Sequence, residues 1–89
     1  MRLDQFLKWS RVIPRRTMAN ATCDAGRVTV NGQAGRPGRV LKPGDVVTVL
    51  LPHRELKFRV RSIPDRAPAK SEAGELIEIL ENNRRETEV

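Results

Sequence analysis

The feature that most constrains this 89-residue chain is Pro14, which stands between two stretches with helical periodicity. Proline cannot lie inside a helix, and it pushes the residue before it toward extended backbone. The first stretch, "RLDQFLKWSRV", is therefore expected to end as a helix near Val12. Its apolar face repeats at the spacing i, i+3, i+4 and i+7 through Leu3, Phe6, Leu7 and Ser10. The start of the chain thus predicts a helix-turn-helix pair.

The second stretch predicts a helix from about Arg15 to Ala25, which Gly26 ends in a left-handed conformation. Small residues at helical spacing are expected to face the first helix: Met18, Ala21, Thr22 and Ala25. The start of this helix is unusual, because helix amino termini carry partial positive charge and favour acidic residues. Arg15 and Arg16 stand there instead, and no Ser, Thr, Asp or Asn precedes Arg16 as a cap.

The middle of the chain predicts a small antiparallel sheet. An Asn31-Gly32 pair that follows alternating valines is a strong hairpin signal. Residues 35–39 contain too much Gly and Pro for a regular strand and are expected to form an exposed loop. Strands are expected again over residues 46–51 and 55–63.

The last part of the chain differs in composition. A Pro-rich linker, residues 64–70, leads to a capping residue, Ser71, and to a predicted short helix that frays beyond Asn82. The apolar stripe of this helix consists of Ala73, Leu76, Ile77 and Leu80. The predicted fold class is α+β: a helix-turn-helix pair, a small antiparallel β-sheet and a short C-terminal helix. Residues 1–63 are expected to form the domain, and residues 64–89 the linker, acidic helix and frayed end.

Charge points to a polyanionic partner. The formal net charge is +6 and the sequence pI is about 10.7. Residues 1–66 contain 14 Lys and Arg against 5 acidic residues, whereas residues 67–89 contain 3 against 6. The body of the protein is therefore basic and the tail acidic.

The residues needed for catalysis or metal binding are missing. His53 is the single histidine and lies in a predicted turn beside Pro52, without a second His or Cys at ligand spacing. Cys23 has no thiol partner and is interpreted as a small helix residue. The glycines lack the Gly-Lys-Ser/Thr ending of a phosphate loop. We expect no enzyme activity, no catalytic residue, no metal site and no cofactor.

Targeting signals are missing as well. The sequence shows no apolar leader and no run of about 18 apolar residues, so neither export nor membrane insertion is indicated. We expect a cytoplasmic protein without a membrane partner.

The uncapped cationic helix start indicates a phosphate ligand. Its first backbone N–H groups lack partners within the helix, and guanidinium groups bind phosphate oxygens bidentately. Arg15 and Arg16 are therefore candidate RNA-binding residues. The other candidates are cations expected near this corner or in the loop: Arg2, Lys8, Arg11, Arg36 and Arg39. The alternative is that these side chains are merely solvated.

Three further features leave alternatives open. Trp9 either covers the edge of the core or stacks on a base. Lys57, Arg59 and Arg61 share one face of a strand, which is either solvated or a second phosphate track. Acidic residues at steps of three in the tail are either solvated or docked on a basic protein partner: Glu72, Glu75, Glu78 and Glu81.

Several motifs match a known pattern at fixed spacing: Arg-Leu-Asp at the start of the first helix, Arg at the start of the second, Gly-x-Val-x-Val-Asn-Gly, and a Lys-x-Gly-Asp turn. In this chain they lie in "RLDQFLKWSRVIPRRTMANATCDAGRVTVNGQ" and "VLKPGDVVTV". Over about residues 1–50 the chain resembles the RNA-binding module first described in ribosomal small-subunit protein four. The Arg-Arg pair and the short acidic tail are most similar to the stand-alone RqcP (YabO) family of bacterial ribosome-associated quality control, which is related to the small heat-shock ribosome-binding proteins.

This resemblance implies a non-catalytic adaptor. Members of that family bind the large ribosomal subunit carrying an obstructed nascent chain, contact its ribosomal RNA and the tRNA, and support C-terminal alanine tailing by an RqcH-type factor. The resemblance implies RNA roles for Arg2 and Arg16 above all, and a supporting role for Asp4 in orienting neighbouring arginines. It makes residues 1–63 an RNA-binding domain with its motif core in residues 1–50. The free protein is expected to be a monomer.

Two other functions stay open on the sequence. One is a heat-shock-type recycling factor for the large subunit, although those relatives carry a longer, basic tail. The other is a protein-interaction module that acts through its acidic tail.

Overall fold

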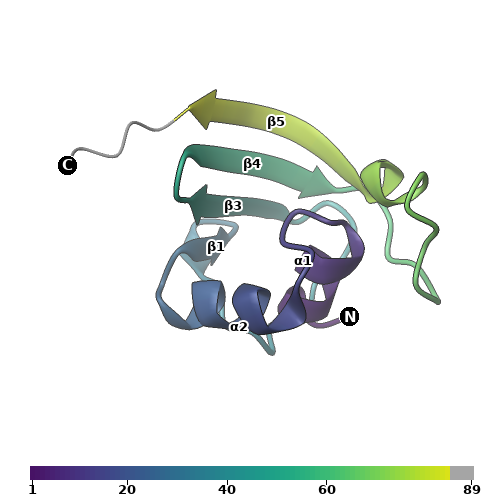
Figure 1. Ribbon diagram of the computed structural model, residues 1–89, viewed down its shortest axis with the longest axis horizontal. Coiled ribbons are helices and arrows are strands. Elements are labelled where there is room, and N and C mark those ends of the chain that lie inside the picture. Colours follow the sequence, from purple (N-terminus) through teal and green to yellow (C-terminus); the bar gives the residue numbers. More distant parts are fainter. Residues whose placement is uncertain (85–89) are drawn as a thin grey trace.

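The arrangement of the chain is described by a computed structural model for residues 1–84 (Figure 1). Within this range two helices, α1 (Leu3–Trp9) and α2 (Arg16–Asp24), precede a five-stranded antiparallel sheet with the strand order β2-β1-β3-β4-β5. The strands are β1 (Val28–Val30), β2 (Gln33–Ala34), β3 (Val46–Leu51), β4 (Arg54–Val60) and β5 (Ile77–Arg84). In Figure 1 the helices lie below β1 and β3, and β5 is the edge strand farthest from α2. The predicted α+β class is confirmed.

The helix-turn-helix pair is confirmed, but α1 ends at Trp9 rather than near Val12. Arg11 adopts a φ of 63°, a left-handed backbone that ends the helix. The Ile13 amide then donates to the Leu7 carbonyl at 3.1 Å, which satisfies one of the open carbonyls of the last turn. The early end brings Ile13 into the core, where it is buried.

The apolar face predicted for α1 is buried as expected, including Ser10. The face predicted for α2 is wrong. Ala19 and Cys23 are buried, whereas Met18 leaves 58% of its surface exposed. Small residues occur around most of this helix, so the sequence pattern does not single out the side that packs. Burial raises the pKa of the Cys23 thiol to about 11, which keeps the thiol protonated at neutral pH.

The predicted hairpin is confirmed. Asn31 and Gly32 have φ values of 52° and 81°, which is the backbone of a type I′ turn, and they join β1 to β2. The Asn31 side chain also accepts a hydrogen bond from the Val46 amide at 2.9 Å, so the turn is attached to the start of β3. The strand expected over residues 55–63 is observed as β4, but it ends at Val60.

The core lies between the two helices and one face of β1, β3 and β4. Phe6 of α1 stacks on Phe58 of β4 with 6.2 Å between ring centroids. The remaining buried side chains are mostly aliphatic, as the composition requires. Gly35 lies close against this core, because a Cβ atom there would stand 2.9 Å from Leu3 Cδ2 and 3.1 Å from the Val28 carbonyl oxygen.

The predicted C-terminal helix is wrong. A single 3₁₀ turn, η1 (Ala73–Leu76), is followed by β5, which pairs antiparallel with β4 along its whole length. The predicted fraying beyond Asn82 is also wrong for Asn83 and Arg84, which continue β5; residues 85–89 lie outside the described residues. The tail forms a strand because the edge of β4 offers it backbone partners, and tertiary pairing of this kind outweighs local helix preference.

No helix in residues 1–84 is both long and apolar enough to cross a membrane.

Candidate RNA-binding site

The start of α2 is uncapped in the structure. Arg15 occupies the cap position with extended backbone, φ −105° and ψ 124°, and its side chain makes no capping hydrogen bond. The first turn of α2 also contains no acidic residue. The amides of this turn and the positive end of the helix dipole are therefore available to an anion.

A buried carboxylate connects the two helices next to this start. Asp4 of α1 is only 1% exposed. It accepts hydrogen bonds from the Gln5 amide at 2.8 Å and from Nδ2 of Asn20 at 3.4 Å. Its two oxygens also meet Arg2 Nε at 3.2 Å and Arg16 Nε at 3.6 Å. Asp4 thus holds one cation from the start of each helix.

The electrostatics of this arrangement leave positive charge facing solvent. The Arg2 and Arg16 side chains are 52% and 50% exposed, whereas the Asp4 side chain is 2% exposed. Burial alone raises the pKa of Asp4, but hydrogen bonds from Arg2, from the Gln5 amide and from Asn20 lower it below the ordinary value. Asp4 is therefore ionised at neutral pH and offsets one of the two guanidinium charges. We call Arg2, Asp4, Arg15 and Arg16 the inter-helix corner.

The Gly- and Arg-rich loop lies against the same corner. Its carbonyl oxygens at Arg39 and Pro37 accept the Leu3 and Asp4 amides at 2.8 and 3.1 Å, so the loop caps α1. Arg36 and Arg39 line an open hollow of about 500 Å³ in this loop. A Cβ atom on Gly38 would lie 3.9 Å from a terminal nitrogen of Arg2, which places the loop beside that guanidinium group.

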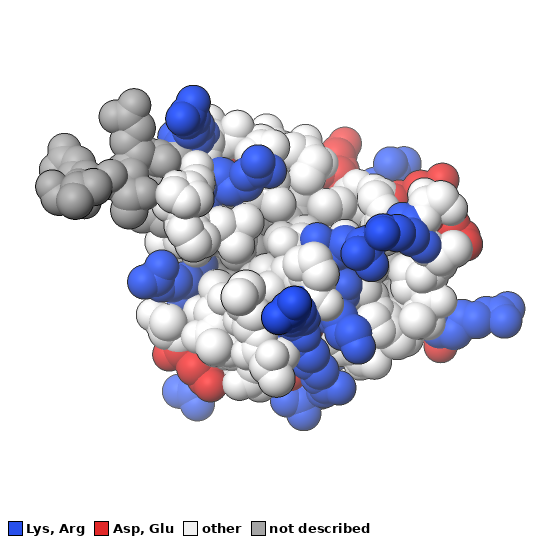
Figure 2. All heavy atoms as spheres, viewed as in Figure 1, with Lys and Arg blue, Asp and Glu red and all other residues white. Residues whose placement is uncertain are grey.

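The remaining predicted cations lie at the other end of α1. Lys8 and Arg11 are exposed and line a hollow of about 170 Å³ together with Trp9 and the linker residue Pro68. Trp9 is half-buried and packs against the core, which agrees with the structural alternative for this residue. Figure 2 shows Lys and Arg atoms across much of this face, several of them over the two helices, whereas the acidic atoms lie mainly at the lower left and along the right side.

Asn20 contributes to the site but is not predicted by the sequence pattern. It lies four residues after Arg16, on the same face of α2, and this spacing is the signal that could have connected it to the site. Its amide group donates to Asp4 and so helps to fix the carboxylate that orients both arginines.

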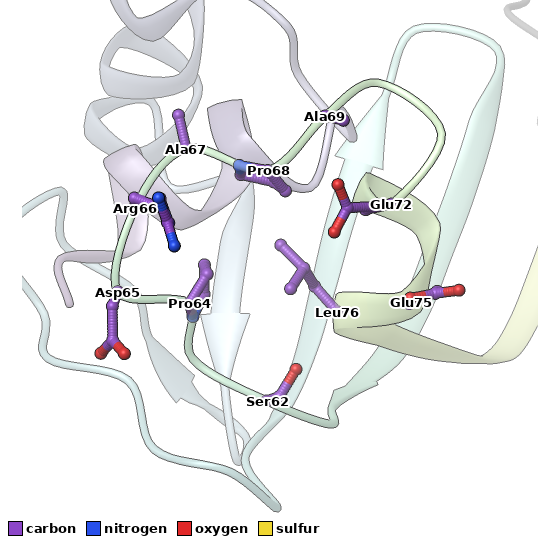
Figure 3. A pocket seen from close by; sticks show the side chains of 10 residues that line it. All are labelled: Ser62, Pro64, Asp65, Arg66, Ala67, Pro68, Ala69, Glu72, Glu75 and Leu76. Carbon is purple, nitrogen blue, oxygen red and sulfur yellow. The ribbon is translucent and has the colours of Figure 1, made fainter.

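Another hollow lies elsewhere. It measures about 570 Å³ and is lined mainly by the linker and η1 (Figure 3). In Figure 3 Leu76 points into it, whereas the carboxylates of Asp65 and Glu75 point away. None of the predicted site residues lines it, and residues 1–84 contain no group of three or more His, Cys, Asp or Glu placed to hold a metal ion. The inter-helix corner is therefore the better candidate site.

The chain is similar in sequence to known proteins. The S4 domain family matches residues 1–47. The chain is 39% identical over 79 residues to an "RQC P-site tRNA stabilizing factor" of Halalkalibacterium halodurans, with 89% of each chain covered. It is 38% identical to the protein of the same name from Bacillus subtilis, covering 94% of this chain and 96% of that one. The identity to the protein of this name from Streptococcus pneumoniae is 37% over all of both chains.

A solved structure shares the fold. The trimeric structure of Vibrio cholerae Heat Shock Protein 15 superposes with a TM-score of 0.82 and 28% sequence identity, covering 89% of this chain and 80% of that one.

Proposed function

Because the chain belongs to the S4 domain family and to the family of RQC P-site tRNA stabilizing factors, we propose that it is an RNA-binding adaptor that acts on the large ribosomal subunit during quality control. In this role it binds ribosomal RNA and the tRNA in the P site. The relatives are named for stabilising a tRNA rather than for a reaction, which agrees with a non-catalytic role.

One observation carries the proposal for the site: a buried carboxylate, Asp4, orients Arg2 and Arg16 beside an uncapped helix start. A phosphate group placed there can accept hydrogen bonds from two half-exposed guanidinium groups and from the free amides of α2. Both cations are fixed before RNA arrives, so less side-chain entropy is lost on binding. Arg15, Arg36 and Arg39 extend this surface, and Lys8 and Arg11 contact RNA beyond the end of α1.

The finer part of the proposal concerns the ribosomal complex. The protein binds large subunits that carry an obstructed nascent chain on tRNA, and it supports alanine tailing by an RqcH-type factor. By holding the tRNA in place it would keep the nascent chain attached while residues are added. The free protein is a monomer in this proposal.

The Arg16→Ala variant tests the RNA-binding surface. Removing one phosphate contact is expected to reduce the slope of log affinity against log salt by about 0.7 to 0.9. Arg27→Ala is the matched control, because Arg27 is an exposed cation at the opposite end of α2. If both variants bind RNA as the wild type does, the corner is not the RNA-binding site.

A heat-shock-type function in recycling large subunits is the second candidate, and the likeness to Heat Shock Protein 15 favours it. Sedimentation through sucrose gradients separates the two functions. Co-migration only with subunits that carry peptidyl-tRNA supports the quality-control role, whereas equal co-migration with empty subunits supports general ribosome binding.

A further inference from the structure

Strand β5 pairs acidic side chains with two of the three cations that the sequence left as either a solvated face or a second phosphate track. Lys57 and Glu81 are register partners, as are Arg59 and Glu78. The Lys57 Nζ atom lies 3.7 Å from Glu81 Oε2, and Arg59 Nη1 donates to Glu78 Oε1 at 2.5 Å. Two cations on the sheet face turned away from the helices are therefore each paired with a carboxylate.

An irregularity in β5 makes both pairs possible. Side chains alternate between the two faces of a strand, so residues three apart, such as Glu78 and Glu81, normally point to opposite faces. The β4–β5 register shifts between Lys57 and Phe58, and this shift places one extra β5 residue, Leu80, between the paired positions. Both glutamates then lie on the same face, opposite cations that are only two residues apart.

The pairs contribute little to stability. Their four side chains are between 43% and 56% exposed, and ion pairs at such positions typically contribute about 0 to 1 kcal/mol. Their larger effect is on the surface potential. Without the glutamates, Lys57 and Arg59 would form an unpaired row of cations on one face of β4, about 6.6 Å apart at two-residue spacing, and Arg61 follows directly after the strand. Such a row is a non-specific contact for an RNA backbone.

We propose that β5 neutralises cations on the outer face of β4 and thereby keeps RNA off this face, so that RNA binds at the inter-helix corner and the cations beside it. Glu78 and Glu81 then determine specificity without touching RNA, because they remove a competing surface. The inference rests on the RNA-binding function proposed above. It also gives two of the acidic tail residues, Glu78 and Glu81, partners inside the same chain.

The test compares two double variants that add the same net charge. Glu78→Gln with Glu81→Gln frees the two β4 cations. Asp65→Asn with Glu72→Gln is the matched control, because these exposed carboxylates form no ion pair among residues 1–84. Binding of a poly(U) oligonucleotide is measured against salt concentration, and circular dichroism checks that each variant keeps its strands.

Two extra phosphate contacts are expected to steepen the salt slope of the Glu78/Glu81 variant by about 1.4, so that its affinity falls about sevenfold more than that of the wild type between about 50 and 200 mM salt. Adding Arg16→Ala to this variant should leave most poly(U) binding in place. Equal slopes for the variant and its control would overturn the inference. A separate result would count against the proposed function: the Arg16→Ala variant binding ribosomal RNA as tightly as the wild type does.

Discussion

Replacing Asp4 by Asn is the sharpest test of how the corner is organised. The side chain is buried, bridges α1 and α2, and meets the Arg2 and Arg16 guanidinium groups within 3.6 Å. Asn is nearly the same size and keeps an oxygen for the Gln5 amide. The substitution therefore removes the charge that orients the two arginines while it leaves the packing of α1 in place.

The cost in stability follows from the partners that are lost. Arg2 makes hydrogen bonds to Asp4 and Arg16 an ion pair, and because both arginines are half-exposed, solvent screening reduces each contact to about 1 kcal/mol. The free energy of unfolding should fall by about 2 kcal/mol in total. For a domain of this size the melting temperature should fall by about 8 to 16 °C, measured by circular dichroism.

The effect on RNA binding separates two possible roles of Asp4. It either orients Arg2 and Arg16 or only lowers the net positive charge of the site. Removing a carboxylate beside an RNA site raises affinity if only net charge matters. We expect the opposite, because Arg2 and Arg16 lose their fixed orientation, and affinity measured well below the melting temperature should fall about tenfold, or about 1.4 kcal/mol. Asp24→Asn is the control of equal charge at the far end of α2. Tighter binding by Asp4→Asn, equal to that of the control, would refute the positioning role.

Two further outcomes follow from the same contacts. The pKa of Asp4 lies below its ordinary value of 3.8, so its stabilisation is complete above that value and is lost as the pH falls through the lowered pKa. In urea titrations the wild type should have a higher free energy of unfolding than Asp4→Asn at neutral pH, and this difference should disappear only under acidic conditions. A constant difference at all pH values would contradict this. Gly35→Ala places a methyl carbon 2.9 Å from Leu3 Cδ2 and should destabilise the fold by about 1 to 3 kcal/mol in urea unfolding, whereas Gly38→Ala meets nothing closer than 3.9 Å and should not.

Local signals predicted the first half of the chain. Pro14 separates the helices, and Asn31-Gly32 forms the turn that its backbone preferences require. The family resemblance read from residues 1–50 is confirmed as well. Pro14 and the Asn31-Gly32 pair are reliable signals because each acts through backbone geometry within a few residues, independently of the tertiary structure.

The tail was mispredicted because its pattern fits two structures. Acidic residues at steps of three and the stripe from Ala73 to Leu80 are typical of a helix. The same spacing is satisfied in the structure by a 3₁₀ turn and a bulged strand, because the register shift adds one residue between Glu78 and Glu81. Which structure forms depends on the free edge of β4, and a linear pattern does not contain that information.

The geometry of the corner was only partly accessible from sequence. The motif predicts the cations and a supporting role for Asp4, but the contact from Asn20 and the buried face of α2 depend on how the helices cross. Small residues around α2 give no preferred side, so packing against the sheet decides it.

The attachment of α1 to a distant loop has a consequence for synthesis of the protein. The amides of Leu3 and Asp4 are satisfied by carbonyls of Arg39 and Pro37, and the Leu41 amide donates to the Met1 carbonyl at 2.9 Å. A nascent chain that has not yet exposed Pro37 and Arg39 therefore lacks the cap of its first helix. Arg2 therefore acquires its final surroundings only after residues 37–41 have emerged and folded against the start of α1.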